Sequence, residues 1–166
     1  MAGSSSVYRW DNLFLLAIAA AAYWALGYLS ITYIADPANK IAIIWPASGL
    51  ALGFLLLFGR KYWPGIFLGS LLTEMYAYDQ PLGMSFLMAC GASLEAIVGC
   101  TVLMRHGRVF TLSRTHDFFR FCMVAALCAI FSASIGVATL VGAGVLPTHA
   151  AAHAFFNWWQ GDTVGV

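Results

Sequence analysis

Residues 118–142 read FFRFCMVAALCAIFSASIGVATLVG, and Arg120 is the only charged residue in this run. A transmembrane helix needs about 20 mostly apolar residues to cross a hydrocarbon core of roughly 30 Å. The run is long enough to make that crossing, and further apolar runs lie on both sides of it. We predict six spans, at about residues 12–35, 41–59, 62–78, 82–104, 118–142 and 150–166.

The composition of the 166-residue chain supports a membrane protein. Hydrophobic residues make up 61% and charged residues 9% of the chain, whereas soluble proteins have roughly 45–50% and 25%. A soluble fold of this length could not cover so much apolar area, because much of its surface stays in water. The fold class we predict is all-α: a polytopic transmembrane helical bundle, with the lipid bilayer as its partner.

Charge and cysteine content exclude other classes of protein. The formal net charge is +1, which gives no basic surface for nucleic acid, and the apolar content excludes a disordered chain. The cysteines lie in apolar runs without a CxxC spacing, so we interpret them as small apolar residues. They are Cys90, Cys100, Cys122 and Cys128. No HExxH, Walker, GxSxG or kinase motif is present, so we predict that this chain is not an enzyme by itself.

Basic residues are distributed unequally between alternate loops. Those in or next to the N-terminal tail, the second loop and the fourth loop are Arg9, Arg60, Lys61, Arg105, Arg108, Arg114 and Arg120. Lys40 is the one basic residue in the loops on the other side. Because basic loops stay in the cytoplasm, we predict a cytoplasmic N-terminal tail at residues 1–11 and, with six spans, a cytoplasmic C-terminus.

Carboxyl groups within apolar spans are the strongest functional candidates. Glu95 and Asp162 lie at comparable depth in two parallel spans, and Asn157 lies on a nearby part of the sixth span. Arg105 and Arg120 are the only basic side chains that we expect could reach them. A carboxylate inside a membrane is costly and usually faces the bundle interior, where burial favours its protonated form. Either each acid bonds a neighbouring helix, or the acids form a polar ligand pocket or a proton-responsive site.

Two other polar features have simpler interpretations. We interpret Glu74, near the outer end of the third span, as an interfacial carboxylate in the aromatic belt beside Tyr76 and Tyr78. His149 and His153 stand four residues apart at the start of the sixth span, so they share a helix face. They could bind a metal ion or haem, but a pair without a third ligand is more typical of interfacial polar residues.

Several motifs, in this order, resemble the membrane-associated sensor domain of the first kind, one of the bacterial MASE domains. The stretches that carry the resemblance are IIWPASGLALGFLLLFGRKYWPGIFLGSLLTE at 43–74, GASLEAIVGCTVLMR at 91–105, FSASIGVATLVGAG at 131–144 and NWWQGDTVGV at 157–166. The motif residues are Trp45, Pro46, Gly49, Arg60, Trp63, Pro64, Gly69, Glu95, Trp159, Gly161, Asp162 and Gly165. Ala92 and Ser93 stand where Asn-Thr is common in the family. If that Asn contacts ligand in relatives, this protein is expected to bind a different one.

The resemblance implies an integral membrane sensor domain at residues 12–166, located in the inner membrane of a bacterium. Members of that family usually precede a cytoplasmic histidine kinase, diguanylate cyclase or cyclic-di-GMP phosphodiesterase in the same polypeptide. By this analogy we expect a total of about eight spans, an output domain beyond residue 166, and a homodimer.

Our leading hypothesis is a sensory input domain that binds a small-molecule or ion signal between the second, fourth and sixth spans. Glu95 and Asp162 would line the site, with Trp45, Asn157 and Trp159 as its walls. Paired acids and spans interrupted by Pro and Gly also suit a small transporter. The two histidines leave haem or metal binding open, and a structural oligomerisation module is a further alternative.

Overall fold

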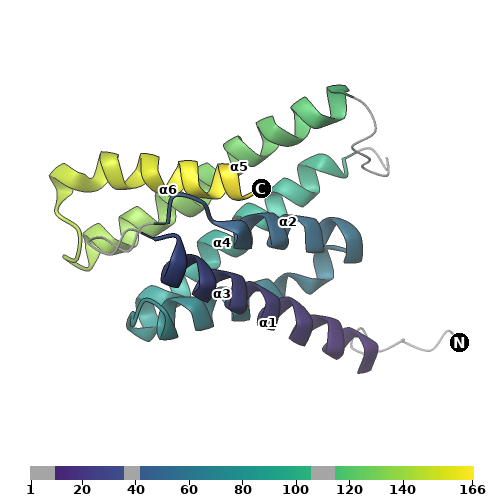
Figure 1. Cartoon of the computed structure of the whole chain (residues 1–166), viewed down its shortest axis with the longest axis horizontal. Helices are drawn as coiled ribbons and strands as arrows, with labels where there is room; N and C mark the ends of the chain where they lie inside the picture. Colours follow the sequence, from purple (N-terminus) through teal and green to yellow (C-terminus); the bar gives the residue numbers. More distant parts are fainter. Residues whose placement is uncertain (1–9, 36–41, 106–114) are drawn as a thin grey trace, which may run out of the picture.

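The computed structural model describes residues 10–35, 42–105 and 115–166, which form a bundle of helices (Figure 1). The elements are α1 (Trp10–Tyr33), α2 (Pro46–Phe58), the 3-10 helix η1 (Arg60–Tyr62), α3 (Trp63–Tyr76), α4 (Leu82–Leu103), α5 (Thr115–Gly142), the 3-10 helix η2 (Thr148–Ala150) and α6 (Ala151–Gly165). These residues contain no strand, only an isolated bridge between Ala35 and Ala42. The all-α prediction is confirmed.

Helix length divides the bundle into two groups. Three of the described helices are long and apolar enough to cross a membrane: α1 from Asn12 to Tyr33, α4 and α5. In contrast, α2, α3 and α6 have 13, 14 and 15 residues, so they rise only about 20–22 Å against a hydrocarbon core of roughly 30 Å. Each predicted span contains one helix, but the structure does not confirm that all six cross the bilayer.

The second helix begins later than we predicted. We expected a helix from residue 41, whereas α2 starts at Pro46 and residues 42–45 are not helical. Proline fits the first turn of a helix because no N–H is needed there, and it disfavours helical backbone in the residue before it. Residues 42–45 therefore run beside α6 instead of extending α2.

Helix α4 makes the most extensive packing contacts of the described helices. It contacts α5, α3 and α2, while α1 packs on α3, and α6 packs on α5 and α2. The contact between α1 and α3 is close because glycines face it: a Cβ on Gly69 would lie 2.6 Å from the Ala20 carbonyl oxygen. The main apolar core includes the fully buried Leu55, Ile66 and Cys100, from α2, α3 and α4.

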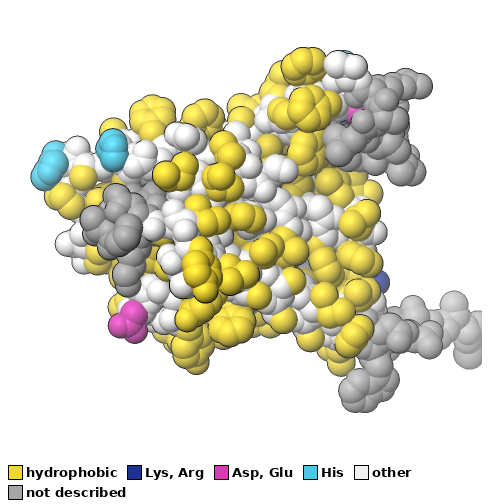
Figure 2. All heavy atoms as spheres, viewed as in Figure 1, with side chains coloured by type: hydrophobic (Ala, Val, Ile, Leu, Met, Phe, Trp, Pro, Cys, Tyr) yellow, Lys and Arg dark blue, Asp and Glu magenta, His cyan; other side chains and the backbone are white. Residues whose placement is uncertain are grey.

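The outer surface is apolar over most of the face shown in Figure 2. Leu57, Phe14 and Phe119 are 80%, 68% and 64% exposed. Exposed apolar area on this scale marks a surface that lipid or another protein covers. Lys or Arg and His appear at opposite ends of the same view. Four basic residues used to predict the orientation lie outside the described residues: Arg9, Lys40, Arg108 and Arg114.

Candidate functional site

Glycines bring α6 directly against α2 and the residues that precede it. The Trp45 N–H donates to the Gly161 carbonyl oxygen at 2.9 Å, and a Cβ on Gly161 would lie 2.8 Å from the Ala42 carbonyl oxygen. A Cβ on Gly49 would collide with the Gly165 carbonyl oxygen, and one on Gly165 would collide with that of Trp45. We call this contact, between residues 42–49 and 161–165, the α2–α6 seam.

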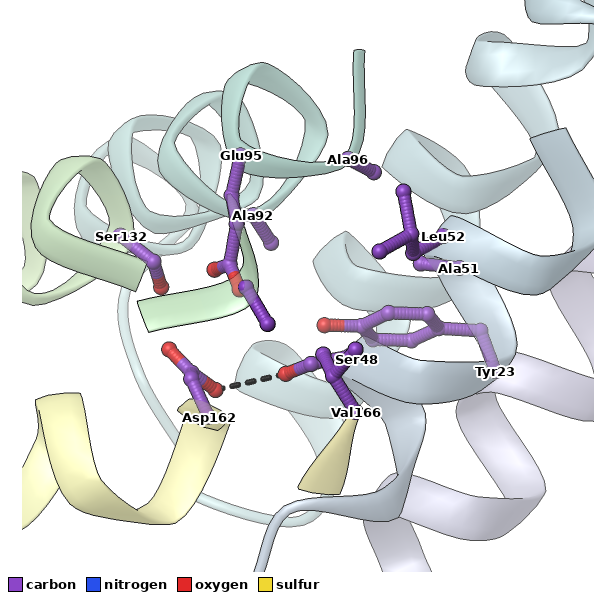
Figure 3. Close-up of a pocket in the computed structure, with 11 residues that line it drawn as sticks. Tyr23, Ser48, Ala51, Leu52, Ala92, Glu95, Ala96, Ser132, Asp162 and Val166 are labelled. Atoms are coloured by element: carbon purple, nitrogen blue, oxygen red, sulfur yellow. Dashed lines mark hydrogen bonds between the residues drawn. The ribbon is translucent and has the colours of Figure 1, made fainter. Parts of the chain in front are cut away.

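The seam places Asp162 in the interior, where it is 2% exposed. The Ser48 Oγ donates to Asp162 Oδ1 at 2.7 Å, while Oδ2 is buried without a partner in hydrogen-bonding geometry among the described residues. Glu95 of α4 is 7% exposed, and its carboxyl group interacts directly with that of Asp162, with Ser132 of α5 next to both (Figure 3). Two acids from different helices thus share one buried site.

Two cavities adjoin this carboxyl pair. The smaller one, shown in Figure 3, has a volume of about 10 Å³, roughly the room that one water molecule needs. The larger one has a volume of about 290 Å³, close to the lower end of the range for ligand pockets, roughly 300–1,000 Å³. Tyr23, Ala92, Ser132 and Asp162 line both cavities. A ligand in the larger cavity would therefore lie beside the carboxyl pair.

The described residues that line the larger cavity include acidic and aromatic side chains but no basic one. Its polar and aromatic lining residues are Tyr23, Trp45, Ser70, Glu74, Tyr78, Gln80, Ser132, Trp158 and Asp162. No Lys, Arg or His is among the described residues that line it. Arg120, which we considered as a partner, donates from Nη2 to the Val102 carbonyl oxygen at 2.6 Å, and Arg105 is exposed. Because buried ions are costly unless they are paired, these carboxyl groups need protons or a bound cation.

Glu74 differs from our interpretation of the sequence. We expected an interfacial carboxylate in the aromatic belt, but Glu74 is 6% exposed and lines the larger cavity. Ser70 lies one helical turn before it and lines the same cavity, because residues four apart share a helix face. Tyr76 lies on another face of α3 and is 69% exposed. Position near a helix end indicates depth in the membrane, but it does not indicate which face is buried.

The structure brings one of the three predicted wall residues to the cavity. Trp45 lines it. Asn157 and Trp159 line neither cavity: the Asn157 amide contacts His153 Nδ1 at 3.2 Å, and Trp159 Nε1 donates to the Ala126 carbonyl oxygen at 2.7 Å. These two residues of α6 therefore bond outside the site.

Trp158, and not its neighbour Trp159 as we predicted, is the tryptophan of α6 at the site. It lines the larger cavity, and its ring lies over α5, where a Cβ on Gly136 would be 2.6 Å from the ring. Successive helical residues point about 100° apart, since a turn takes 3.6 residues. Choosing between two adjacent tryptophans needs the rotation of α6, which the apolar sequence around them does not fix.

The two histidines do not gather further ligands in the described part of the chain. His149 lies in η2 and His153 in α6. Among the described residues, no group of three His, Cys, Asp or Glu side chains is placed to hold a metal ion. His149 and His153 therefore lie near the start of α6 without a third metal-ligating side chain among the described residues.

Several motif residues stand at the start of helices or form hydrogen bonds between them. Pro46 and Pro64 stand in the first turns of α2 and α3, and Trp63 begins α3. Arg60 donates from Nη1 to Thr101 Oγ1 at 3.1 Å, which ties η1 to α4. These contacts fix the positions of α2, α3 and α4, from which the lining residues project.

Sequence reasoning missed the hydroxyl groups of the site. Ser48, Ser132 and Tyr23 line one or both cavities, yet hydroxyl residues are frequent in membrane helices and carry no distinctive signal. Tyr78, which we had placed beside Glu74 in the aromatic belt, lies just after the end of α3 and lines the larger cavity.

The fold and the site define an all-helical membrane domain with buried acids beside a cavity. A family model described as MASE1 matches residues 12–166. The chain belongs to the MASE1 family, a family of membrane sensory input domains rather than catalytic ones. This match confirms the resemblance carried by the sequence motifs. A search of curated proteins and a search of solved structures found no match.

Proposed function

We propose that this chain is the input domain of a bacterial signalling protein, that its signal binds in the larger cavity, and that binding regulates a cytoplasmic output domain. One observation carries the proposal. Asp162 lines both cavities, accepts a hydrogen bond from α2 and interacts with Glu95 of α4. A ligand that touches Asp162 therefore acts on the contact between α6 and two other helices. Family membership supports the sensory role.

The cavity is suited to coupling because its walls come from several helices. Tyr23 belongs to α1, Glu74 to α3, Met88 to α4, Leu140 to α5 and Trp158 to α6. A ligand favours whichever helix arrangement it binds more tightly. A tenfold preference shifts the balance between two arrangements by about 1.4 kcal/mol. The shift would pass through α6 toward a histidine kinase or a cyclic-di-GMP enzyme, which we propose from the family resemblance.

Localisation and assembly complete the proposal. We place the domain in the inner membrane of a bacterium, with the N-terminal tail in the cytoplasm, because the basic residues favour that orientation. We also propose a homodimer, since signalling proteins commonly act as dimers. Both statements rest on the sequence pattern and on analogy.

The test is Glu95→Gln in the full-length protein, which keeps the shape of the side chain and removes its charge. We expect the activity of the output domain to change by several-fold at unchanged membrane abundance, measured as kinase autophosphorylation or cyclic-di-GMP turnover. The exposed Asp79 lies outside both cavities, so Asp79→Asn serves as the control and should leave output unchanged.

A second variant keeps the proposal testable if Glu95→Gln fails to fold. Ala92 lines both cavities, so Ala92→Leu fills space without changing charge. We expect it to fix the output at one level that no longer responds to the cell's growth conditions. Normal, responsive output from both variants at normal abundance would show that the cavity does not bind the signal.

A further inference from the structure

We propose that the larger cavity binds an organic ammonium ion with at least one N–H group and an apolar substituent. This inference rests on the proposed function in one respect, that the larger cavity is the signal site. It adds the chemical class of the signal, which neither the family nor the motifs specify. Charge, aromatic walls and an unsatisfied acceptor each support it.

The charge of the lining favours a cation. Glu74 and Asp162 both line the cavity and are 6% and 2% exposed, and Glu95 adjoins Asp162. No basic side chain stands among the described lining residues. An anion would meet these carboxyl groups in a region of low dielectric, where repulsion is strong. A bound cation would favour the ionised form of Glu74 and Asp162 and pair with the resulting carboxylates.

The aromatic side chains favour an organic cation over a bare one. Trp45 and Tyr78 both line the cavity, and their ring centroids are 6.4 Å apart. Tyr23 and Trp158 add two further rings to the lining. Aromatic faces attract cations positioned within about 6 Å of the ring centroid. The aromatic rings and the carboxyl groups of the lining would together attract the charged nitrogen of an organic ammonium ion.

A hydrogen-bond acceptor on Asp162 indicates that the charged nitrogen of the ligand carries N–H groups. Asp162 Oδ2 is buried and makes no hydrogen bond of good geometry with the described residues, although the side chains of Glu95, Ser132 and Trp158 lie near this carboxyl group. A buried acceptor without a donor loses the free energy that water would have supplied. An N–H of a primary or secondary ammonium would satisfy it by a charge-assisted hydrogen bond, which a fully alkylated ammonium lacks.

The size and the remaining lining call for an apolar substituent. The volume of about 290 Å³ is far more than a single metal ion occupies. The rest of the lining is mainly apolar, including Met88, Leu140, Val145 and Leu146. The described residues also lack three metal-ligating side chains in one group. An amphipathic amine fits this combination better than an inorganic cation.

The experiment compares phenethylamine with 2-phenylethanol, which has the same ring and chain but no charge. The purified full-length protein is placed in lipid nanodiscs and titrated by calorimetry with each compound. We expect phenethylamine to bind at least tenfold more tightly than the alcohol. Because Trp45 and Trp158 line the cavity, tryptophan fluorescence should change with the same midpoint.

Two variants test whether Glu74 and Tyr78 contribute to binding the positive charge of the amine. Glu74→Gln should weaken phenethylamine binding by about 10- to 100-fold, as expected for losing a charged partner, and should leave the alcohol unaffected. Asp79→Asn is the matched control and should change neither affinity. If Glu74→Gln does not fold, Tyr78→Leu should weaken the amine selectively through loss of a ring.

The outcomes separate this inference from the proposed function. Equal affinity for the two compounds, no binding of either, or an unchanged amine affinity in Glu74→Gln and Tyr78→Leu would each overturn the ammonium proposal. The signal site itself is tested by the output of Glu95→Gln and Ala92→Leu. If those variants alter output while the amine fails to bind, the cavity is the signal site for another class of ligand.

Discussion

At the residue scale, Asp162 connects α6 with α2, α4 and both cavities. It accepts a hydrogen bond from Ser48, interacts with Glu95 and lines both cavities. The sequence indicated both acids, because a carboxyl group in an apolar run is rare and costly. It did not indicate Ser48, whose role depends on the rotation and close approach of α2. A carboxyl group in a membrane span can be picked out from the sequence because its burial is costly. Its hydrogen-bond partners can be identified only once the packing of the helices is known.

The hydrogen bond from Ser48 to Asp162 should contribute measurably to stability. We expect Ser48→Ala to lower the free energy of unfolding by about 1–3 kcal/mol, because it leaves a buried acceptor with less hydrogen bonding. The measurement is a titration with denaturing detergent, followed by circular dichroism.

Ser30→Ala is the control for this prediction. Ser30 is also buried, but its Oγ donates to the Leu26 carbonyl oxygen of its own helix at 2.8 Å, a bond that adds little to helix stability. Its replacement should cost less than about 1 kcal/mol. Similar losses in the two variants would show that the bond to Asp162 contributes nothing specific.

At the element scale, the α2–α6 seam decides where the site forms. The Trp45-Pro46 pair was a visible signal that a helix begins there, since proline disfavours helix in the residue before it. We nevertheless predicted a helix from residue 41, because the hydropathy of residues 42–45 matches that of a span. Hydropathy reports only that side chains avoid water, and a non-helical segment can be apolar too: Ala42 is buried, whereas Ile43 and Ile44 are 63% and 39% exposed.

Close packing at the seam predicts different effects for two glycines of one helix. A Cβ on Gly49 would collide with the Gly165 carbonyl oxygen, whereas a Cβ on Gly53 meets nothing within 4 Å. We expect Gly49→Ala to destabilise the protein by about 1–3 kcal/mol through overpacking. Gly53→Ala should be neutral or stabilising by up to about 1 kcal/mol, since alanine favours helix.

The same detergent titration measures both glycine variants. Because Gly49→Ala forces α6 away from α2, it should also alter the output of the full-length protein, while Gly53→Ala should not. Equal stability of the two variants would mean that the seam is looser than the structure shows, and that it does not hold Asp162 in place.

At the scale of the whole molecule, composition was enough to predict the fold class but not the number of spans. Backbone groups in lipid must be satisfied within helices or a closed barrel, and continuous apolar runs of about 20 residues favour helices. An all-α fold therefore followed from the 61% hydrophobic content arranged in such runs. Residues 42–45 fall in the second predicted span but are not helical, and α3 and α6 have only 14 and 15 residues. The exposed side chains alone do not distinguish a short crossing helix from one that enters and returns.

Helix α3 decides between these two topologies. It has 14 residues, a rise of about 21 Å, with Lys61 in η1 before it and the exposed Asp79 after it. The distribution of basic residues predicts Lys61 in the cytoplasm and Asp79 outside. In a background with the four native cysteines replaced by alanine, we expect a membrane-impermeant maleimide to label Asp79→Cys in intact cells and Lys61→Cys only in inside-out vesicles. Labelling of both from one side would make α3 re-entrant and reverse the predicted direction of every later helix.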